Sequence, residues 1–509
     1  MSYPEFVFGG EVYYATSDHC GYCDGKKDPM EKRFSLQSFR DEYLKKQSDP
    51  SYNTKYEILP KSVTMGCHVY YFTPSCYEDI MSRGFRRSGT FLYRPDQLRN
   101  CCRMYTIRTR LSWLKPTKEH RHTVNRFMKH ILGNDKDTGN DKKKSQPFNL
   151  SDLIRFELDT PKSKFHTRIE PAKATEEKFQ LYKKYQMTVH KDKASDLSMK
   201  GFKRFLCEDP FDGEALGMTD NITPDFEKMN SWRAEKLKSG DPSIFGAVHE
   251  CYYINEKLIA IAVLDILPNS ISSVYFIWDP DYAHLGLGTL SALREMLLTE
   301  QLGKEFYYMG YYIADCVKMK YKAKFSGEVL DISTEKYIRL DSLNGIIDDG
   351  GLIVSSPSST PDAKIEHQIT GALHGSLDTS VINAAEEIYG MNGGAYENAK
   401  EHASKIVTKD KFLKKLQTPS DDKVWMSRTS QMFELPLVSP GLIPIWQIDD
   451  ILSSNRINTL FKGLRCYNSF GALSPFKYTK GNDPRKYQII KYLRLFGEAH
   501  FEKPGVILM

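Results

Sequence analysis

The clearest pattern of apolar and polar residues along this chain lies between residues 245 and 325. Residues Val248–Ile254 alternate, the polar pair Asn255-Glu256 follows, and Leu258–Leu267 is a continuous apolar run. Alternation is typical of a strand with one covered face, whereas a continuous, β-branched run indicates a strand that is buried on both faces. The pattern predicts a hairpin that enters the centre of a sheet.

A βαβ unit is predicted directly after this hairpin. Ile271–Trp278 is expected to be a third strand, which ends at Asp279-Pro280. The segment His284–Thr289 contains two glycines and leads into an amphipathic helix; a further strand, Glu305–Tyr312, and a basic helix, Ala314–Phe325, come next. Because the N–H groups at a helix start attract anions, the glycine turn is a potential anion site.

The flanking regions have weaker patterns. Residues 5–130 are rich in strand and turn signals, and Phe179–Met187 and Gly201–Leu206 have the apolar spacing of helices. Gly133–Gln146 has almost no apolar residue, which predicts a mobile loop. The expected fold class is therefore mixed α and β (α+β/α-β), with a mixed central sheet, flanking helices and a cysteine-rich N-terminal domain.

Composition narrows the class of protein. The chain has 509 residues, 40% of them hydrophobic, which is enough for two or more globular domains. The start, MSYPEFVFGG, does not have the pattern of a signal peptide, and no apolar run approaches the ~20 residues that span a bilayer. These features predict a soluble intracellular protein. The net charge of +6 is mild and does not by itself imply nucleic acid.

Two pairs of cysteines point to a metal site. Cys20 and Cys23 form a C-x-x-C pair, and Cys101 and Cys102 are adjacent. Brought together by folding, they can supply four thiolates to zinc or to an iron–sulfur cluster, and intracellular thiols stay reduced. A redox pair and unconnected buried thiols are the alternatives. Weaker candidates for ligands or their neighbours are His19, Cys67, His68 and Cys76.

A basic stripe with interleaved aromatic residues extends from Arg83 to Lys129. Eight arginines lie between Arg83 and Arg110, in the same segment as Tyr93 and Tyr105. Such a stripe suits phosphate or carboxylate ligands, with a solvated basic face as the alternative.

The order hairpin, strand, glycine turn, helix, strand resembles the core of the GNAT acyltransferases. In that superfamily the turn usually reads R/Q-x-x-G-x-G/A and cradles the pyrophosphate of acetyl-CoA. Here Gly286 and Gly288 match the glycines, but no Arg or Gln stands at the expected start. The resemblance therefore favours GNAT relatives that take their acyl group from an aminoacyl-tRNA, without acetyl-CoA.

Several stretches together resemble the arginyl-tRNA–protein transferases of the eukaryotic, fungal type. The combination is more specific than any single motif and covers roughly the first 325 residues, whereas residues 346–509 match less well. The stretches are C-G-Y-C at 20–23, Arg83–Gly89, Cys101-Cys102-Arg103, Leu181–Gln186 with Val189-His190, Val263–Pro268, Tyr275–Pro280, Tyr308–Tyr312 and Lys318–Lys322.

This resemblance implies transfer of arginine from Arg-tRNA to the α-amino group of proteins with N-terminal Asp, Glu or oxidised Cys. In the N-degron pathway this transfer marks many proteins for degradation. The resemblance also implies zinc or an iron–sulfur cluster on the four cysteines, and a cytoplasmic and secondarily nuclear location.

Five segments are expected on this basis. They are an N-terminal metal-binding and acceptor-recognition domain at 1–132, a linker or loop at 133–150, a GNAT-like aminoacyl-transfer domain at 151–345, a peripheral insertion at 346–435, and a C-terminal segment at 436–509 that packs on the transferase domain.

The transfer needs a group that orients or deprotonates the acceptor amine. Asp279, beyond a central strand, is one catalytic candidate, with a turn cap as the alternative. Asp265 lies in an apolar strand and needs a cation or donor if buried. The arginyl guanidinium is one such cation, and a structural hydrogen bond is the alternative.

Further residues are candidates for binding the two substrates. Arg83, Arg86 and Arg87 suit an acidic acceptor terminus, because a guanidinium can bind a carboxylate with two hydrogen bonds. The candidates for the arginyl ester and the tRNA are His249, Gly286, Gly288, Tyr311, Lys318 and Lys322. Ordinary packing or a solvated helix face is the alternative for the histidine, the tyrosine and the lysines.

Two other functions fit parts of the pattern. One is an acetyl-CoA-dependent N-acetyltransferase, and the other is a metal-stapled RNA-binding adaptor that retains the GNAT unit as a scaffold. Labelled Arg-tRNA and a peptide that starts with Asp distinguish them from an arginyltransferase.

Overall fold

The computed structural model describes most of the chain. The described residues are 4–17, 19–27, 36–53, 62–132, 149–161, 164–213, 225–234, 245–343, 347, 351–353, 388–390, 394–410, 413, 432–433, 435–467, 473–479 and 485–508. The predicted linker lies outside this set except for residues 149–150, and the predicted insertion at 346–435 lies mostly outside it. None of the described helices combines the length and apolar content needed to cross a membrane.

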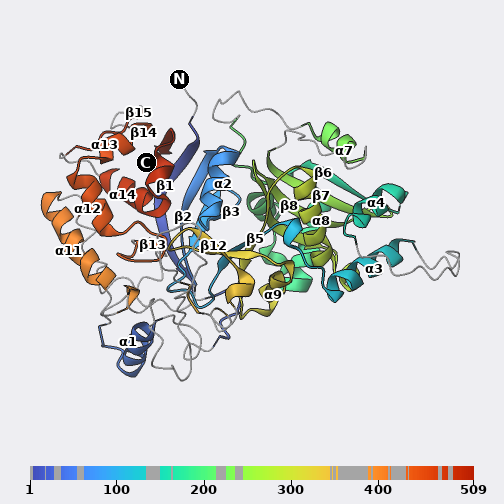
Figure 1. Ribbon diagram of the computed structural model, residues 1–509, viewed down its shortest axis with the longest axis horizontal. Helices are drawn as coiled ribbons and strands as arrows, with labels where there is room; N and C mark the ends of the chain where they lie inside the picture. Colours follow the sequence, from blue (N-terminus) through green and yellow to red (C-terminus); the bar gives the residue numbers. More distant parts are fainter. Residues whose placement is uncertain are drawn as a thin grey trace.

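Two mixed sheets organise the molecule (Figure 1). The first has the order β15-β14-β16-β1-β2-β4-β3, with β13 paired to β1. Its strands are β1 Phe6–Ser17, β2 Ser62–Phe72, β3 Arg86–Ser88, β4 Phe91–Pro95, β13 Met432–Phe433, β14 Leu464–Tyr467, β15 Leu473–Pro475 and β16 Gly505–Leu508.

The second sheet has the order β12-β11-β5-β10-β9-β8-β7-β6. Only β9 and β10 pair in parallel among its described strands, and the other neighbours are antiparallel. Its strands are β5 Tyr105–Thr109, β6 Phe165–Pro171, β7 Gly246–Ile254, β8 Lys257–Ile266, β9 Ser270–Trp278, β10 Phe306–Tyr312, β11 Glu328–Asp331 and β12 Lys336–Arg339.

Helices cover the faces of both sheets. Those up to residue 234 are α1 Gln37–Ser48, α2 Pro74–Ser82, α3 Lys118–Leu132, α4 Asp152–Asp159, α5 Glu176–Tyr185, α6 Met199–Phe202 and α7 Phe226–Ala234. The later ones are α8 Leu287–Gln301, α9 Val317–Lys320, α11 Gly394–Lys409, α12 Ile445–Ser453, α13 Ile457–Leu460, α14 Arg485–Phe496 and α15 Glu498–Phe501. Helix α8 packs on one face of the second sheet within a core that includes residues of α3, and α5 packs on the other.

The predicted hairpin and βαβ unit are confirmed. Strands β7 and β8 pair from Gly246↔Ile266 to Ile254↔Lys257, and both turn residues, Asn255 (φ 49°) and Glu256 (φ 61°), have left-handed backbone angles. Such angles at both central positions are those of a tight hairpin turn that matches the strand twist. Helix α8 then connects β9 to the parallel β10, the crossover that parallel neighbours require.

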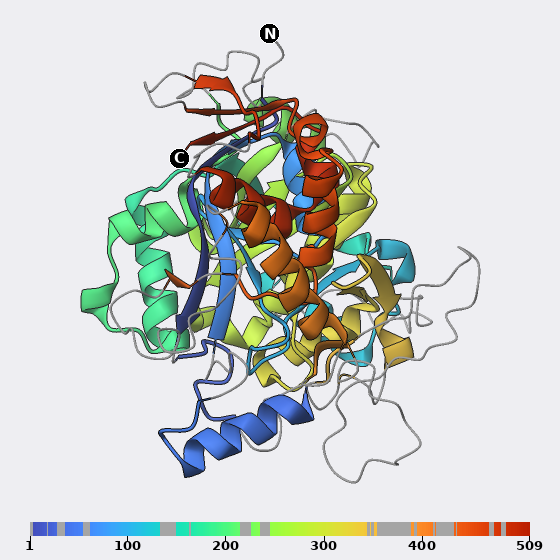
Figure 2. The same ribbon diagram turned by 90° about the vertical axis from the view of Figure 1, so that its left-hand side faces the viewer.

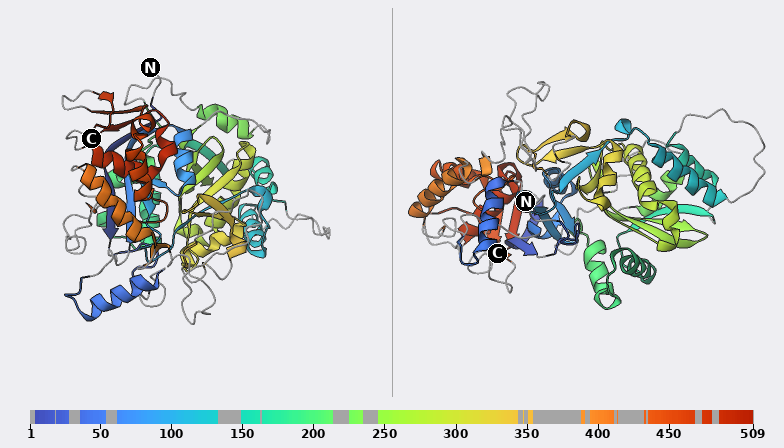
Figure 3. Two further views of the ribbon diagram at one scale, coloured as in Figure 1. Left: turned by 60° about the vertical axis from the view of Figure 1, so that its left-hand side comes forward. Right: turned by 90° about the horizontal axis from the view of Figure 1, so that it is seen from below.

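The two ends of the chain lie together. Strand β16 pairs in parallel with β1 from Phe6↔Gly505 to Gly9↔Leu508, and Figure 2 shows the C-terminal helices beside the N-terminal strands. Buried residues of α12, α14 and α15 share one core with those of β1 and β2. In the right panel of Figure 3, these segments form one side of the molecule, and the described residues between 150 and 340 form the other.

This arrangement differs from the predicted segments in two places. The C-terminal segment covers the N-terminal sheet rather than the transferase domain, because the apolar faces of β1 and β2 need a cover that α12 and α14 supply. The chain also enters the second sheet at β5, well before residue 132, since β5 pairs with both β10 and β11.

Candidate functional site

A cavity of about 730 Å³ opens where β9 and β10 separate. The two parallel strands pair only from Phe306↔Ser270 to Tyr308↔Ser272, although both continue further. Beyond that point their residues line the cavity, together with the first turns of α8. Ligands of α/β sheets commonly bind beyond the carboxyl ends of strands, next to a helix start.

Two buried cations line one wall of the cavity. Arg86, on β3, donates hydrogen bonds to the carbonyl oxygens of Met81 (3.1 Å) and Phe85 (2.5 Å), and its guanidinium lies 5.4 Å from the ring of Tyr311. Lys322 donates to the carbonyl oxygen of Tyr311 at 2.7 Å. Within the described residues, neither cation has a carboxylate partner. Their described hydrogen-bond partners are carbonyl oxygens, which carry no net charge.

Burial changes the pKa of Lys322. Desolvation, reinforced by the charge of Arg86, lowers the pKa of Lys322 to about 7. Gly310 (φ 73°), beside Lys322, lies where the pairing of β10 with β5 shifts register between Tyr308 and Tyr311. This irregularity places the Tyr311 carbonyl oxygen next to the ammonium group.

Arg87 and Asp265 pair with each other, and Arg87 also lines the cavity. Arg87 Nε donates to Asp265 Oδ2 at 2.8 Å, its Nη2 donates to Oδ1, and both side chains are at most 3% exposed. The remaining Nη1 donates to the carbonyl oxygens of Gly89 and Glu208. The expectation that a buried Asp265 needs a cation is met within the chain, and the pair connects β3 of the first sheet to β8 of the second.

The start of α8 provides the glycine-lined end of the cavity. Gly286 has φ 68°, a left-handed backbone angle that residues with a side chain rarely adopt, so this position favours glycine. A Cβ on Gly288 would meet nothing within 4 Å, which leaves open space beside the backbone. The first turn carries no acidic residue, and its N–H groups favour an anion.

The four predicted cysteines come together. The four Sγ atoms of Cys20, Cys23, Cys101 and Cys102 all lie within 4.8 Å of one another. The Sγ atoms of Cys23 and Cys101 are 3.7 Å apart. A tetrahedral zinc site with Zn–S bonds of about 2.3 Å has sulfur atoms about 3.8 Å apart, so the donor set fits a bound metal. Hydrogen bonds from the thiols of Cys101 and Cys102 lower the pKa of Cys20, and the same bonds raise the pKa of the two donor thiols. Cys20 is therefore the first of the four to become the thiolate that a metal requires.

The cysteine cluster lies directly behind the cavity wall. Gly21 and Tyr22, between the first two cysteines, line the cavity, and Tyr311 and Cys316 pack against the cluster. The Cys316 thiol donates to the Tyr22 carbonyl oxygen at 3.6 Å. A metal on the four thiolates would therefore fix the Gly21-Tyr22 wall. The weaker candidates His19, Cys67, His68 and Cys76 are not in the cluster found among the described residues.

Four predicted catalytic or substrate-binding residues do not line the cavity: Asp265, described above, and Asp279, His249 and Arg83. Asp279 caps the 3₁₀ turn Pro280–Leu285 and bonds to Lys184 and Lys257; although burial opposes it, these bonds lower the pKa of Asp279. His249 lies between Lys178 and the Leu206 carbonyl oxygen, and burial together with Lys178 lowers its pKa to about 4. Arg83 donates to the Phe496 carbonyl oxygen and pairs with Glu335.

The two lysines predicted to neutralise tRNA phosphates are in different environments. Lys318, on α9, is exposed at the cavity, whereas Lys322 lies in the 3₁₀ turn Tyr321–Phe325 and is 8% exposed. The helix changes its winding between them, so the two lysines do not share one exposed face. Only Lys318 is placed to meet a phosphate at the surface.

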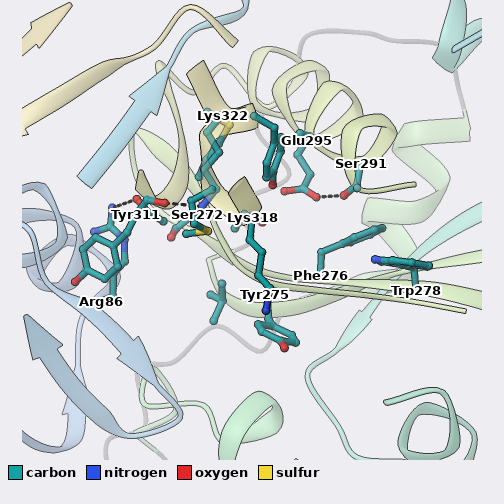
Figure 4. Close-up of a pocket in the computed structure, with 18 of the residues that line it drawn as sticks. Arg86, Ser272, Tyr275, Phe276, Trp278, Ser291, Glu295, Tyr311, Lys318 and Lys322 are labelled. Carbon is teal, nitrogen blue, oxygen red and sulfur yellow. Dashed lines mark hydrogen bonds between the residues drawn. The ribbon is translucent and has the colours of Figure 1, made fainter. Parts of the chain in front are cut away.

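Sequence reasoning missed Glu295 on α8, which lines the cavity. Figure 4 shows Arg86 and Tyr311 on one side, Glu295 and Ser291 on the other, and Lys318 and Tyr275 between them in that view. The signal was present, because Glu295 follows Gly288 by two helical turns and shares its face.

Comparison with known proteins agrees with this geometry. Residues 18–122 and 177–331 match the families described as arginine-tRNA-protein transferase, N terminus and C terminus. The arginyl-tRNA–protein transferase 1 of Saccharomyces cerevisiae is 38% identical over 505 residues, which cover 96% of each chain. The protein of the same name from Arabidopsis thaliana is 33% identical over 46% of this chain and 34% of its own.

A more distant relative matches a shorter stretch. The aspartate/glutamate leucyltransferase of Campylobacter jejuni is 33% identical over 87 residues, which cover 17% of this chain and 36% of its own. The full-length similarity to the yeast protein and the two family matches together identify the family of this chain. The chain belongs to the arginyl-tRNA–protein transferase family and is an arginyltransferase.

Proposed function

We propose that this enzyme transfers arginine from Arg-tRNA to the α-amine of proteins that begin with Asp, Glu or oxidised Cys, in the cytoplasm and the nucleus, and so marks them for degradation. One observation carries the choice of acceptor: Arg86 and Lys322 are buried neighbours that lack a carboxylate partner among the described residues. Two like charges in a buried wall are unfavourable, so Lys322 tends to lose its proton unless a ligand supplies a negative charge. An acidic N-terminal side chain supplies that negative charge.

The chemistry needs little from the protein beyond placement and proton transfer. The acceptor nitrogen attacks the ester carbonyl carbon, a C–N bond forms, and the C–O bond to the terminal ribose breaks. The amine loses a proton and the ribose oxygen gains one. A free α-amine has a pKa of about 7.7–8.0, so a useful neutral fraction exists near pH 7. Alignment of the two reactants then supplies much of the acceleration.

The donor end is proposed to lie along α8 and α9. The open backbone at Gly288 and the N–H groups at the start of α8 suit a phosphate or the terminal adenosine. Helix α9 presents Val317, Lys318 and Lys320 to solvent beside the cavity, where the lysines can meet acceptor-stem phosphates. The tRNA would then approach from this side, with its aminoacyl end inside.

The cysteine cluster is proposed to bind zinc or an iron–sulfur cluster in a structural role. The four thiolates would hold the metal, and the metal would fix Gly21 and Tyr22 in the cavity wall. Loss of the metal is therefore expected to disrupt the acceptor-binding wall of the cavity as well.

Replacing Cys20 and Cys23 by serine tests this dependence. The Cys20→Ser, Cys23→Ser variant should lose most of its bound metal, measured by elemental analysis and visible absorbance, and its transfer activity should fall in parallel. Cys207→Ala is the matched control, since Cys207 is a buried thiol outside the cluster. Full metal content in the double variant would place the ligands elsewhere.

Lys322 gives acceptor preference a pH dependence. Its pKa of about 7 means that the ammonium is charged below that pH and neutral above it. The acceptor preference is kcat/KM for a peptide starting with Asp, divided by kcat/KM for one starting with Asn. This ratio should fall roughly fivefold from pH 6 to pH 8.5, because a neutral hydrogen bond is about 1 kcal/mol weaker than a charged one. The ratio cancels titration of the shared α-amine. Lys322→Arg should flatten the profile, and an unchanged slope in that variant would exclude Lys322.

A direct assay tests the whole proposal. The protein is incubated with labelled Arg-tRNA and peptides that differ only in their first residue: Asp, Glu, oxidised Cys, Asn or Gly. Label should appear on the first three. No label on any peptide would refute the transfer, and equal label on all five would refute the choice of acceptor. Thermal stabilisation by coenzyme A would instead favour an acetyltransferase.

A further inference from the structure

One face of α8 runs from the helix start into the cavity and ends at a carboxylate. Gly288, Ser291, Ala292 and Glu295 follow the i, i+3, i+4, i+7 spacing of a single helix face, and all four line the cavity. From Gly288 to Glu295 the helix rises about 10 Å. A group anchored at the helix start can therefore extend along this face to Glu295.

Glu295 has unusual surroundings for a buried acid. It is 1% exposed, and its carboxylate accepts hydrogen bonds from the hydroxyls of Ser291 and Tyr307, the latter at 2.6 Å. No ion pair to Glu295 occurs among the described residues, and burial raises its pKa. It is also the only carboxylate among the described residues that line the cavity.

Several other buried acids in this fold have a cationic partner. Asp265 pairs with Arg87, and Asp279 pairs with both Lys184 and Lys257. A buried carboxylate with no cation is costly, and hydroxyl donors compensate for only part of the lost hydration. A cationic ligand that enters the cavity would supply the missing charge.

We infer that Glu295 binds the guanidinium of the arginyl group and so selects Arg-tRNA as the donor. This inference rests on the proposed function. Asp265, the acid predicted for this role, is already occupied by Arg87. The arginyl side chain is a planar cation with five N–H donors, which matches a carboxylate and stacks on aromatic faces. Phe276, Trp278 and Tyr321 line the same cavity and offer such faces.

The two charged substrates would then bind at separate positions in one cavity. Glu295 takes the donor's cation. Arg86, on the opposite side in Figure 4, and Lys322, which lies between Arg86 and Glu295 in that view, take the acceptor's anion. Each substrate is repelled from the other's position, so the ester and the amine meet between the two poles. The alternative is a structural Glu295 that only connects α8 to Tyr307 of β10.

The test compares Arg-tRNA with the same tRNA charged chemically with citrulline, the neutral isostere of arginine, using a peptide that starts with Asp. Wild-type enzyme should prefer the arginyl donor by about 100-fold or more in kcat/KM, since a site built for a charged hydrogen-bonded group rejects its neutral analogue. In the nearly isosteric Glu295→Gln, the preference should fall below about tenfold. Ser291→Ala is the matched control, because it removes a hydrogen bond to Glu295 but keeps the charge of Glu295. The preference for the arginyl donor should therefore remain in this variant.

The outcomes are distinct. A preference that is unchanged in Glu295→Gln, whatever the remaining activity, would assign Glu295 a structural role. If the variant transfers neither residue, equilibrium binding of 3′-arginylamido- and 3′-citrullylamido-adenosine decides: equal affinities support the inference, and a retained arginyl preference overturns it. Failure of wild-type enzyme to transfer arginine would refute the proposed function itself.

Discussion

The Asp265→Ala variant is expected to be about 3–5 kcal/mol less stable than the wild-type protein, which is the usual cost of removing one partner of a buried ion pair. The variant leaves the Arg87 guanidinium uncompensated in a site where both side chains are at most 3% exposed. The pair also connects β3 of the first sheet to β8 of the second, across 178 residues of sequence. Urea-induced unfolding followed by circular dichroism measures the loss.

A double variant separates the ion pair from simple packing. Arg87→Met combined with Asp265→Leu removes both charges and keeps most of the volume, so it should recover most of the stability that either single change loses. A loss below about 1 kcal/mol in Asp265→Ala would mean that the pair does not hold the sheets together. Arg87 is then expected to have a mainly structural role. An Arg87→Ala variant should lose free energy of unfolding to a greater extent than it loses affinity for the acceptor.

Local signals in the sequence were sufficient for the hairpin and the βαβ unit. The Asn255-Glu256 turn, the apolar run of β8 and the glycines before α8 act over a few residues, where periodicity and turn chemistry decide the conformation. The cysteine cluster was also predictable, because four thiols in two close pairs are a common donor set for one metal ion or cluster.

Pairings between distant segments were not predictable in this way. No local pattern states that β16 lies beside β1, or that Arg87 rather than a substrate meets Asp265. The roles of charged residues depended on such pairings. Asp279 bonds to two lysines that lie 95 and 22 residues away, and Lys322 turns inward because the helix tightens after Lys320. A residue type and a position along a strand indicate what a side chain needs, but not which partner supplies it.

The Arg86→Ala variant is expected to raise KM for a peptide starting with Asp by roughly 30- to 150-fold. Loss of charge-assisted hydrogen bonds to a buried carboxylate costs about 2–3 kcal/mol, and each 1.4 kcal/mol is a factor of ten. KM for Arg-tRNA should stay within about twofold, because the donor is proposed to bind along α8. Steady-state kinetics with each substrate varied in turn, and circular dichroism to confirm folding, provide the measurement.

Arg83→Ala is the matched control for this change. Arg83 lies three residues away, does not line the cavity, and bonds to the Phe496 carbonyl oxygen and Glu335, so its loss should leave both KM values unchanged. A peptide starting with Asn distinguishes charge recognition from general damage: Arg86→Ala should lower the Asp-to-Asn preference toward unity. Equal losses for both peptides, with the preference intact, would mean that Arg86 only supports the cavity wall, and the acidic terminus would then have to bind elsewhere.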